Sequence, residues 1–285
     1  MTIKASDVKD LREKTGLGMM ECKRALEEAS GDIDLAITNL RKNSALKAEK
    51  KSSRTAVEGI ILTKNNQSSN NSIILEINCE TDFVAKDENF VSFAQDVLDI
   101  CFNSPNKNLE DLLSESIEKK RQSLVQKIGE NIVVRRKANI VDGYVSEYIH
   151  GNNKIGVIVS LENENEELGK DIAMHIAASS PLVVNPEDID ADLLSKEREI
   201  ISAQVAGSDK PQEIMEKMVS GRLDKFLSEV SLINQPFVKD PSEKISSLLS
   251  KSKNNVISFF RFEVGEGIEV EKKDFAKEVQ EQLNS

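Results

Sequence analysis

The sequence predicts a mixed α+β protein in which helices and small antiparallel sheets follow one another along the chain. Three observations predict this class. The first 40 residues show helical periodicity that glycines interrupt. Two β-branched apolar runs, residues 73–77 and 155–159, are typical of buried strands, and a helical pattern follows each of them. Between residues 186 and 230, apolar side chains recur at steps of three and four, as in amphipathic helices.

The composition is that of a globular, acidic protein. The chain has 285 residues, 39% hydrophobic and 31% charged, so it can bury a substantial core and divide into more than one domain. Its 38 Lys and Arg against 49 Asp and Glu leave a formal net charge of -11. Nonspecific nucleic-acid binding depends on neutralising phosphates, so this balance is unfavourable for it. We therefore expect no direct nucleic-acid partner.

The cysteines and the amino terminus indicate in which cellular compartment the protein works. Cys22, Cys79 and Cys101 lie far apart without metal-ligand spacing, so reduced thiols and no metal site are expected. The amino terminus is polar and charged, which argues against a signal peptide, and no apolar run is long enough to span a bilayer. These features predict a cytoplasmic protein without a membrane partner.

Residues 1–40 are expected to form a small module of three helices. Ser6 can cap the first helix, and Gly16 ends it. The second helix is expected to turn Met20 inward, and Asp32 can cap the third. Three short helices joined by glycine turns resemble the ubiquitin-associated fold. A module this small has a marginal core, so its polar faces are better suited to docking than to catalysis.

Residues 41–55 are rich in lysine and arginine, and their apolar periodicity thins. Their cations face a single opposing charge, Glu49. The simplest interpretation is a basic, solvated linker that is partly helical. A partner contact is the alternative.

The middle of the chain contains a degenerate internal repeat, residues 56–140 and 141–264. Each half opens with a strand that starts at Val-Glu-Gly or Val-Asp-Gly. A second apolar strand, a helix that ends near a Ser-Pro pair, and a third strand follow it. We interpret the halves as two related subdomains, each an antiparallel sheet with a helix on one face.

The second half carries an insertion over residues 186–230. Residues 207–211, Gly-Ser-Asp-Lys-Pro, should break it into two helices that fold back as an antiparallel coiled-coil hairpin. Their narrow apolar seams suggest a hairpin that projects from the body, although the pattern is equally compatible with a pair packed flat on the core. Residues 265–285 are expected to form a C-terminal helical module with Phe275, Val279 and Leu283 on one face.

One turn, residues 78–86, stands out because it places an acid beside an aromatic between a buried strand and a helix. Asp87 is a plausible N-cap of that helix. Residue types alone favour an interpretation in which Phe83 packs into the core and Asp82 is solvated. The alternative is that both side chains are exposed and directed at a partner.

Signatures of covalent catalysis are missing from the sequence. Gly265-Glu266-Gly267 lacks the third glycine of a dinucleotide-binding loop, and there is no phosphate-binding loop or nucleophile elbow. His175 lies among apolar residues and is expected to be a core histidine, whereas His150 at a strand end is a better contact candidate. The residues therefore indicate an interaction protein rather than an enzyme.

Several motifs, in order along the chain, resemble the bacterial translation elongation factor Ts family. They cover essentially the whole chain, and together they are far more specific than any one of them. They are Val8-Lys9, Leu11-Arg12, Thr15-Gly16, Gly18-Met19-Met20-Glu21-Cys22-Lys23, Asn78-Cys79-Glu80-Thr81-Asp82-Phe83-Val84-Ala85-Lys86, Met174-His175-Ile176-Ala177-Ala178, Gly221-Arg222, Gln235-Pro236-Phe237-Val238 and Arg261-Phe262-Glu263-Val264-Gly265-Glu266-Gly267. The inserted hairpin favours the bacterial form over shortened organellar relatives.

The resemblance implies a guanine-nucleotide exchange factor for elongation factor Tu, the GTPase that delivers aminoacyl-tRNA, with no cofactor of its own. It would bind the GDP-bound GTPase, release GDP and be displaced by GTP. Phe83 would wedge between helices of the GTPase, which reverses the preference for a core role. The segment implied to disturb the GTPase's Mg²⁺ site is Thr81, Asp82, Phe83 and Val84.

The resemblance also implies further partner contacts. His150 would lie near the phosphate loop of the GTPase. Arg12, Met19, Met20 and Lys23 would help the amino-terminal module to hold the nucleotide-binding domain. Two other classes stay open on the residues alone: a chaperone-like scaffold that drives no exchange, and an enzyme with an unrecognised site.

Overall fold

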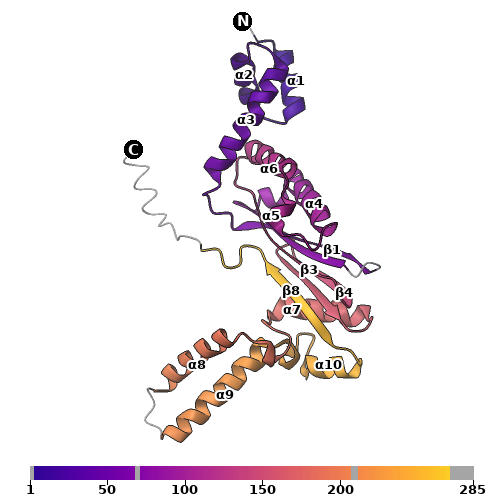
Figure 1. Ribbon diagram of the computed structural model, residues 1–285, viewed down its shortest axis with the longest axis vertical. Coiled ribbons are helices and arrows are strands. Elements are labelled where there is room, and N and C mark those ends of the chain that lie inside the picture. Colours follow the sequence, from indigo (N-terminus) through magenta and orange to yellow (C-terminus); the bar gives the residue numbers. More distant parts are fainter. Residues whose placement is uncertain (1–2, 68–70, 207–210, 270–285) are drawn as a thin grey trace.

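The computed structural model describes residues 3–67, 71–206 and 211–269. It is a mixed α+β structure with helices at the amino-terminal end and small antiparallel sheets in the middle (Figure 1). The mixed class predicted from the sequence is therefore confirmed.

The amino-terminal module consists of α1 (Ala5–Thr15), α2 (Met19–Glu28) and the first half of α3 (Ile33–Lys51). Gly16 ends α1 with φ +68°, a left-handed conformation that glycine adopts without strain. Asp32 caps α3 by accepting a hydrogen bond of 2.9 Å from the Leu35 backbone N–H. Both of these boundary predictions are confirmed.

Two predictions about this module are wrong. Ser6 does not cap α1, because the helix begins at Ala5 and Lys4 occupies the N-cap position. Met20 does not point inward, since its side chain is 75% exposed. The buried face of α2 is set by Cys22 and Leu26, and a residue two positions before Cys22 lies about 200° around the helix from it.

Most of the basic segment after the module is helical. Helix α3 continues without a break to Lys51, so residues 41–51 belong to the same helix as the module. Ser44 and Ala48 are buried, and Ala48 belongs to the core that α4 and α6 share. The apolar pattern thins here because small residues suffice where α3 packs closely against α6 (Figure 1).

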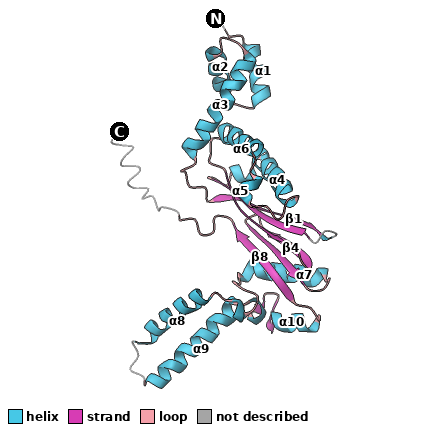
Figure 2. Ribbon diagram, viewed as in Figure 1, coloured by secondary structure: helices cyan, strands magenta, loops and turns pink. Residues whose placement is uncertain are grey.

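The centre of the molecule contains two three-stranded antiparallel sheets, with strand orders β1-β2-β3 and β4-β5-β8. Helix α4 packs on the first sheet, with α6 against α4, and α7 packs on the second sheet (Figure 2). The bounds are β1 Glu58–Asn66, β2 Asn71–Cys79, α4 Glu88–Phe102, α5 Leu109–Leu112, α6 Glu115–Ile128, β3 Val133–Ile140, β4 Tyr144–His150, β5 Ile155–Leu161, α7 Glu166–Ser179 and β8 Val256–Glu263.

Strand β2 is buried along its whole length because the two sheets also pack against each other. Ile73 and Leu75 face the core beneath α4. Ile74, on the opposite face, packs in the cluster between the sheets together with Ile158 of β5. A strand buried on both faces carries a continuous apolar run instead of an alternating one, as the sequence of β2 does.

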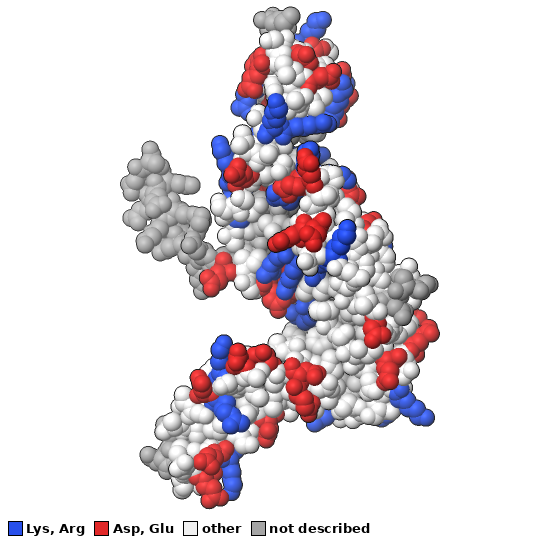
Figure 3. All heavy atoms as spheres, viewed as in Figure 1, with Lys and Arg blue, Asp and Glu red and all other residues white. Residues whose placement is uncertain are grey.

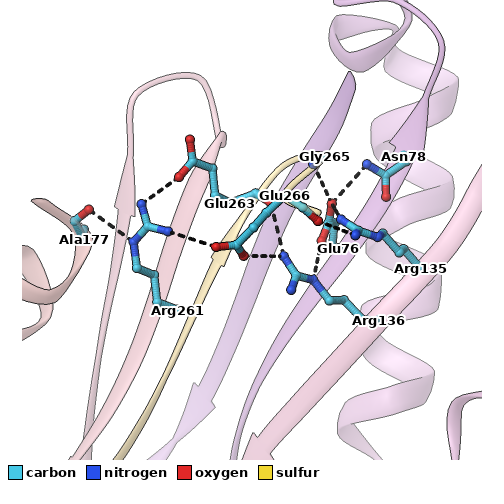
Figure 4. A network of polar contacts seen from close by, with 9 residues as sticks. All are labelled: Glu76, Asn78, Arg135, Arg136, Ala177, Arg261, Glu263, Gly265 and Glu266. Carbon is cyan, nitrogen blue, oxygen red and sulfur yellow. Dashed lines mark hydrogen bonds and ion pairs between the residues drawn. The ribbon is translucent and has the colours of Figure 1, made fainter. Parts of the chain in front are cut away.

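A buried carboxylate joins the two sheets (Figure 4). Glu76 of β2 is fully buried and accepts hydrogen bonds from Arg135 Nη1 at 2.9 Å, Arg136 Nε at 2.5 Å and Asn78 Nδ2 at 3.0 Å. It also accepts one at 2.9 Å from the backbone N–H of Gly265, which follows β8. Burial alone would raise the pKa of Glu76, but these donors outweigh it and lower the pKa below the ordinary glutamate value.

The insertion is a helix pair, α8 (Ala191–Ala206) and α9 (Gln212–Val230). Its helices pack on each other through a cluster that includes Ile201, Val205 and Leu223. The pair projects from the body, so packing flat on the core is excluded (Figure 1).

Several further elements lie at the base of this pair. They are the 3-10 turns Pro186–Asp188 and Leu232–Asn234, strands β6 (Pro236–Phe237) and β7 (Asp240–Lys244), and helix α10 (Ile245–Lys251). Of the helical module expected over residues 265–285, the described part, up to residue 269, contains turns. The rest of that prediction lies outside the described residues.

His175 of α7 is a core histidine, as predicted. It is fully buried, its Nδ1 accepts from the Val238 backbone N–H at 3.2 Å, and its Nε2 lies 2.9 Å from Oε1 of Gln235. Because Nδ1 accepts, Nε2 carries the proton and donates to Gln235, so the ring is neutral. Burial lowers the pKa of His175, although the bond to Gln235 opposes this effect.

We expect this neutral histidine to make stability depend on pH. The unfolded chain binds a proton at His175 below pH ~6.5, whereas burial opposes protonation in the folded chain. The free energy of unfolding therefore falls as pH falls, by up to ~1.4 kcal/mol per pH unit from this group. Urea unfolding of the wild type and of His175→Gln between pH 5.5 and 7.5 should show a smaller slope in the variant. Equal slopes in the two proteins would contradict the assignment.

Candidate functional site

The turn between β2 and α4 is held rigidly from behind. The carboxylate of Glu130, in the loop after α6, accepts hydrogen bonds from the backbone N–H groups of Glu80 at 3.1 Å and Thr81 at 3.0 Å. It also accepts one from Thr81 Oγ1 at 2.7 Å. Val84 is buried in the core and opens the 3-10 turn Val84–Lys86. Thr81 and Val84 therefore fix the backbone of this turn.

The two side chains between these anchors point outward. Phe83 is 81% exposed, more than any other large hydrophobic side chain of the described residues. The core interpretation of Phe83 is therefore wrong. A phenylalanine held in water on a fixed backbone contributes little to folding, but it retains its full burial energy for a partner.

Asp82 is partly exposed and pairs with Lys86 at 2.8 Å. The hydrogen bond from Lys86 lowers the pKa of Asp82, and the charge of Lys154 acts in the same direction. The carboxylate is therefore ionised at neutral pH. Because the pair lies at the surface, it is weak enough for a partner's group to replace either member.

The turn after β4 lies at the same end of the sheets as Phe83. Lys154 donates to Glu58 and to the carbonyl of Gly59, and Glu58 pairs across the sheet with Cys79, just before the Phe83 turn. His150, at the end of β4, is exposed, and its Nδ1 lies 3.0 Å from the Tyr148 hydroxyl. The structure thus brings His150 and the Phe83 turn to the same end of the two sheets.

The predicted contact residues of the amino-terminal module form a second set. Arg12, Met19, Met20 and Lys23 are all exposed, on α1 and α2. A cavity of about 910 Å³ lies between the module and helices α4 and α6, and its lining includes Thr15 of the module and residues at the start of α4.

Glu130 and Lys154 support the site, and neither was predicted from the sequence. Glu130 is about 50 residues from the turn it holds, and Lys154 is about 70 residues from Asp82. A pattern of neighbouring residues carries no signal for such contacts. Only the pairing of strands and the end of α6 bring them together.

The remaining chemistry of the described residues concerns thiols, metal ligands and surface charge. Burial raises the pKa of Cys79 to about 12 and also raises that of Cys101, so both are protonated thiols at neutral pH. Within residues 3–67, 71–206 and 211–269 there is no group of three metal-ligating side chains and no helix able to cross a membrane. On the face shown in Figure 3, acidic and basic side chains are interspersed over the body and the helix pair.

Comparison with known proteins finds the same family along the chain. The family model described as "Elongation factor TS" matches residues 80–266. The chain is 51% identical over 281 residues to elongation factor Ts of Hahella chejuensis, covering 99% of this chain and 98% of that protein. It is 52% identical over 277 residues to the protein of the same name from Marinobacter nauticus, covering 97% and 96%. With that of Legionella pneumophila strain Lens, it shares 50% identity over 291 residues, covering 100% and 99%.

Proposed function

The chain belongs to the elongation factor Ts family, the nucleotide-exchange factors for elongation factor Tu, and we propose that its Phe83 turn is the part that acts on the GTPase. It is an exchange factor rather than an enzyme that makes or breaks covalent bonds. The observation that supports the proposal is the exposure of Phe83 on a turn whose backbone is fixed by Glu130. We further propose that it works in the cytoplasm with elongation factor Tu as its partner.

In this mechanism, the turn weakens GDP binding through the Mg²⁺ site of the GTPase. Mg²⁺ bridges nucleotide phosphates and protein oxygens, so moving its ligands weakens nucleotide binding. Phe83 inserts between helices of the GTPase, and Asp82 faces the displaced Mg²⁺ ligands. Thr81 and Val84 hold the turn, so that binding spends little free energy on ordering it.

The coupling between the two ligands of the GTPase is reciprocal. A factor that binds the nucleotide-free form more tightly expels GDP, and an incoming nucleotide expels the factor by the same free energy. Burying one phenylalanine is worth roughly 1.5–3 kcal/mol. Each ~1.4 kcal/mol removed from the barrier to GDP release raises the release rate tenfold, so burial of Phe83 accounts for an acceleration of roughly 10- to 100-fold.

The other predicted contacts extend this surface. We propose that His150 meets the region of the GTPase phosphate loop. Arg12, Met19, Met20 and Lys23 hold the nucleotide-binding domain from the module. We also propose that the chain is divided into a ubiquitin-associated-like module, two related subdomains built on the two sheets, and a coiled-coil hairpin formed by α8 and α9.

Release of fluorescent GDP from purified elongation factor Tu tests the proposal. The factor is added at one-hundredth of the GTPase concentration with excess unlabelled nucleotide. An exchange factor turns over and releases all of the labelled GDP. A scaffold that binds without driving exchange would leave the release rate at its spontaneous value, and that result would reject the proposal.

Asp82→Ala should slow stimulated GDP release, and more strongly when Mg²⁺ is abundant. The reason is that its carboxylate acts against Mg²⁺ ligation, so its removal matters most when free Mg²⁺ competes to restore the site. The measurement is a series of release rates from low to high Mg²⁺. Glu115→Ala removes a comparable exposed carboxylate from a Lys pair on α6 and should match the wild type throughout. An Asp82→Ala defect that did not change with Mg²⁺ would argue against this role.

A further inference from the structure

The end of α6 and the loop after it contact several parts of the chain that lie far apart in sequence. We call residues 126–131 the α6 corner. Gln126 Nε2 donates to Glu21 Oε1 of the module at 2.8 Å. The same oxygen of Glu21 accepts from Lys47 of α3. The corner therefore holds α2 and α3 at one point.

Lys127 contacts both α4 and the module. Its Nζ donates to Asn89 Oδ1, in the first turn of α4, at 2.7 Å. The end of the same side chain lies against Gly16, where an added Cβ would be 3.1 Å from Lys127 Cε. Gly16 joins the helices that carry Arg12 and Met19. One side chain thus touches both the module and the helix that follows the Phe83 turn.

The rest of the corner holds the Phe83 turn and the end of α3. The Gly129 carbonyl accepts from Lys51. Glu130 binds the backbone of the turn, as described above. The backbone N–H of Asn131 donates to Glu80 Oε1 at 2.6 Å, and its side chain donates to the Arg54 carbonyl at 2.8 Å.

We propose that the α6 corner positions the three-helix module relative to the Phe83 turn, with Gln126 and Lys127 as the positioning residues. This inference rests on the proposed function, in which one GTPase meets both sets of contacts. A module held in place presents its contacts as soon as Phe83 engages, whereas a module free to pivot would lose orientational freedom on binding. The corner therefore sets how tightly the factor engages, while Phe83 sets how fast GDP leaves.

The docking itself can be measured without a partner. The three native cysteines are buried, so spin labels can be directed to Lys9→Cys on the module and Gln95→Cys on α4, both exposed positions. In the otherwise wild-type chain we expect one narrow distance distribution between the labels. Gln126→Ala combined with Lys127→Ala should at least double its width. The matched control, Gln212→Ala with Lys217→Ala, removes an exposed glutamine and an exposed lysine from α9 and should leave it unchanged. An unchanged distribution in the corner variant would overturn the proposal.

Exchange kinetics test whether the α6 corner sets how tightly the factor engages the GTPase. The corner variant should need about tenfold more factor for half-maximal GDP release, with the maximal rate unchanged because Phe83 is intact. In a background of Met19→Ala and Met20→Ala, the corner substitutions should add little, since they act through the module. A lowered maximal rate, or full additivity, would overturn the positioning role. If the wild type released no GDP, the proposed function would fail, while the distance distribution would still decide the docking.

Discussion

Phe83→Ala should slow stimulated GDP release by roughly 10- to 100-fold while leaving the melting temperature of the free protein nearly unchanged. The rate loss follows from the roughly 1.5–3 kcal/mol gained when a phenylalanine is buried, which is available only in the complex. The unchanged stability follows from the exposure of this side chain in the free protein. Thermal melting and GDP release, measured on the same preparation, check both parts.

Phe90→Ala is the matched control for Phe83. Phe90 lies seven residues further on, is fully buried in the core beneath α4, and should cost ~3–5 kcal/mol of stability when truncated. Exchange per folded molecule should stay close to normal in that variant. If Phe83→Ala behaved like this control, with lower stability and normal exchange, the wedge role would be rejected.

Glu76→Ala should destabilise the protein by about 3 kcal/mol at pH 7. Removing one partner of a buried ion pair leaves uncompensated charge and typically costs ~3–5 kcal/mol. Here Arg135 would lose its carboxylate, while Arg136 would keep its pair with Glu266 at 3.0 Å. We expect the low end because both arginines are partly exposed. Urea unfolding at pH 7 measures the loss. Asp99→Ala, which breaks the exposed pair with Lys64, is the control and should cost less than ~1 kcal/mol.

The pH dependence of the Glu76 effect follows from its lowered pKa. The stabilisation is fully present above the ordinary glutamate pKa and is lost as pH falls through the lower folded-state value. The difference between the wild type and Glu76→Ala should therefore shrink in acid. A difference below ~1 kcal/mol at pH 7 would contradict the role of this network.

Local sequence features determined much of the fold. The left-handed Gly16, the Asp32 cap and the apolar run of β2 are properties of a few neighbouring residues, and each appears where it was predicted. Asp87 likewise caps α4 by accepting from the Asn89 and Phe90 backbone N–H groups at 2.8 and 3.2 Å. The two amphipathic helices of the insertion follow from periodicity in the same way.

The tertiary structure alone decided which side chains these elements bury. Met20 faces water and Ala48 faces the core because of how α2 and α3 pack. Apolar periodicity does not specify this packing when only a few apolar residues mark a helix face. Phe83 is exposed because Glu130, about 50 residues away, fixes the turn on which it sits. Such contacts form between segments far apart in sequence, so their energy depends on the arrangement of whole elements and is absent from any local pattern.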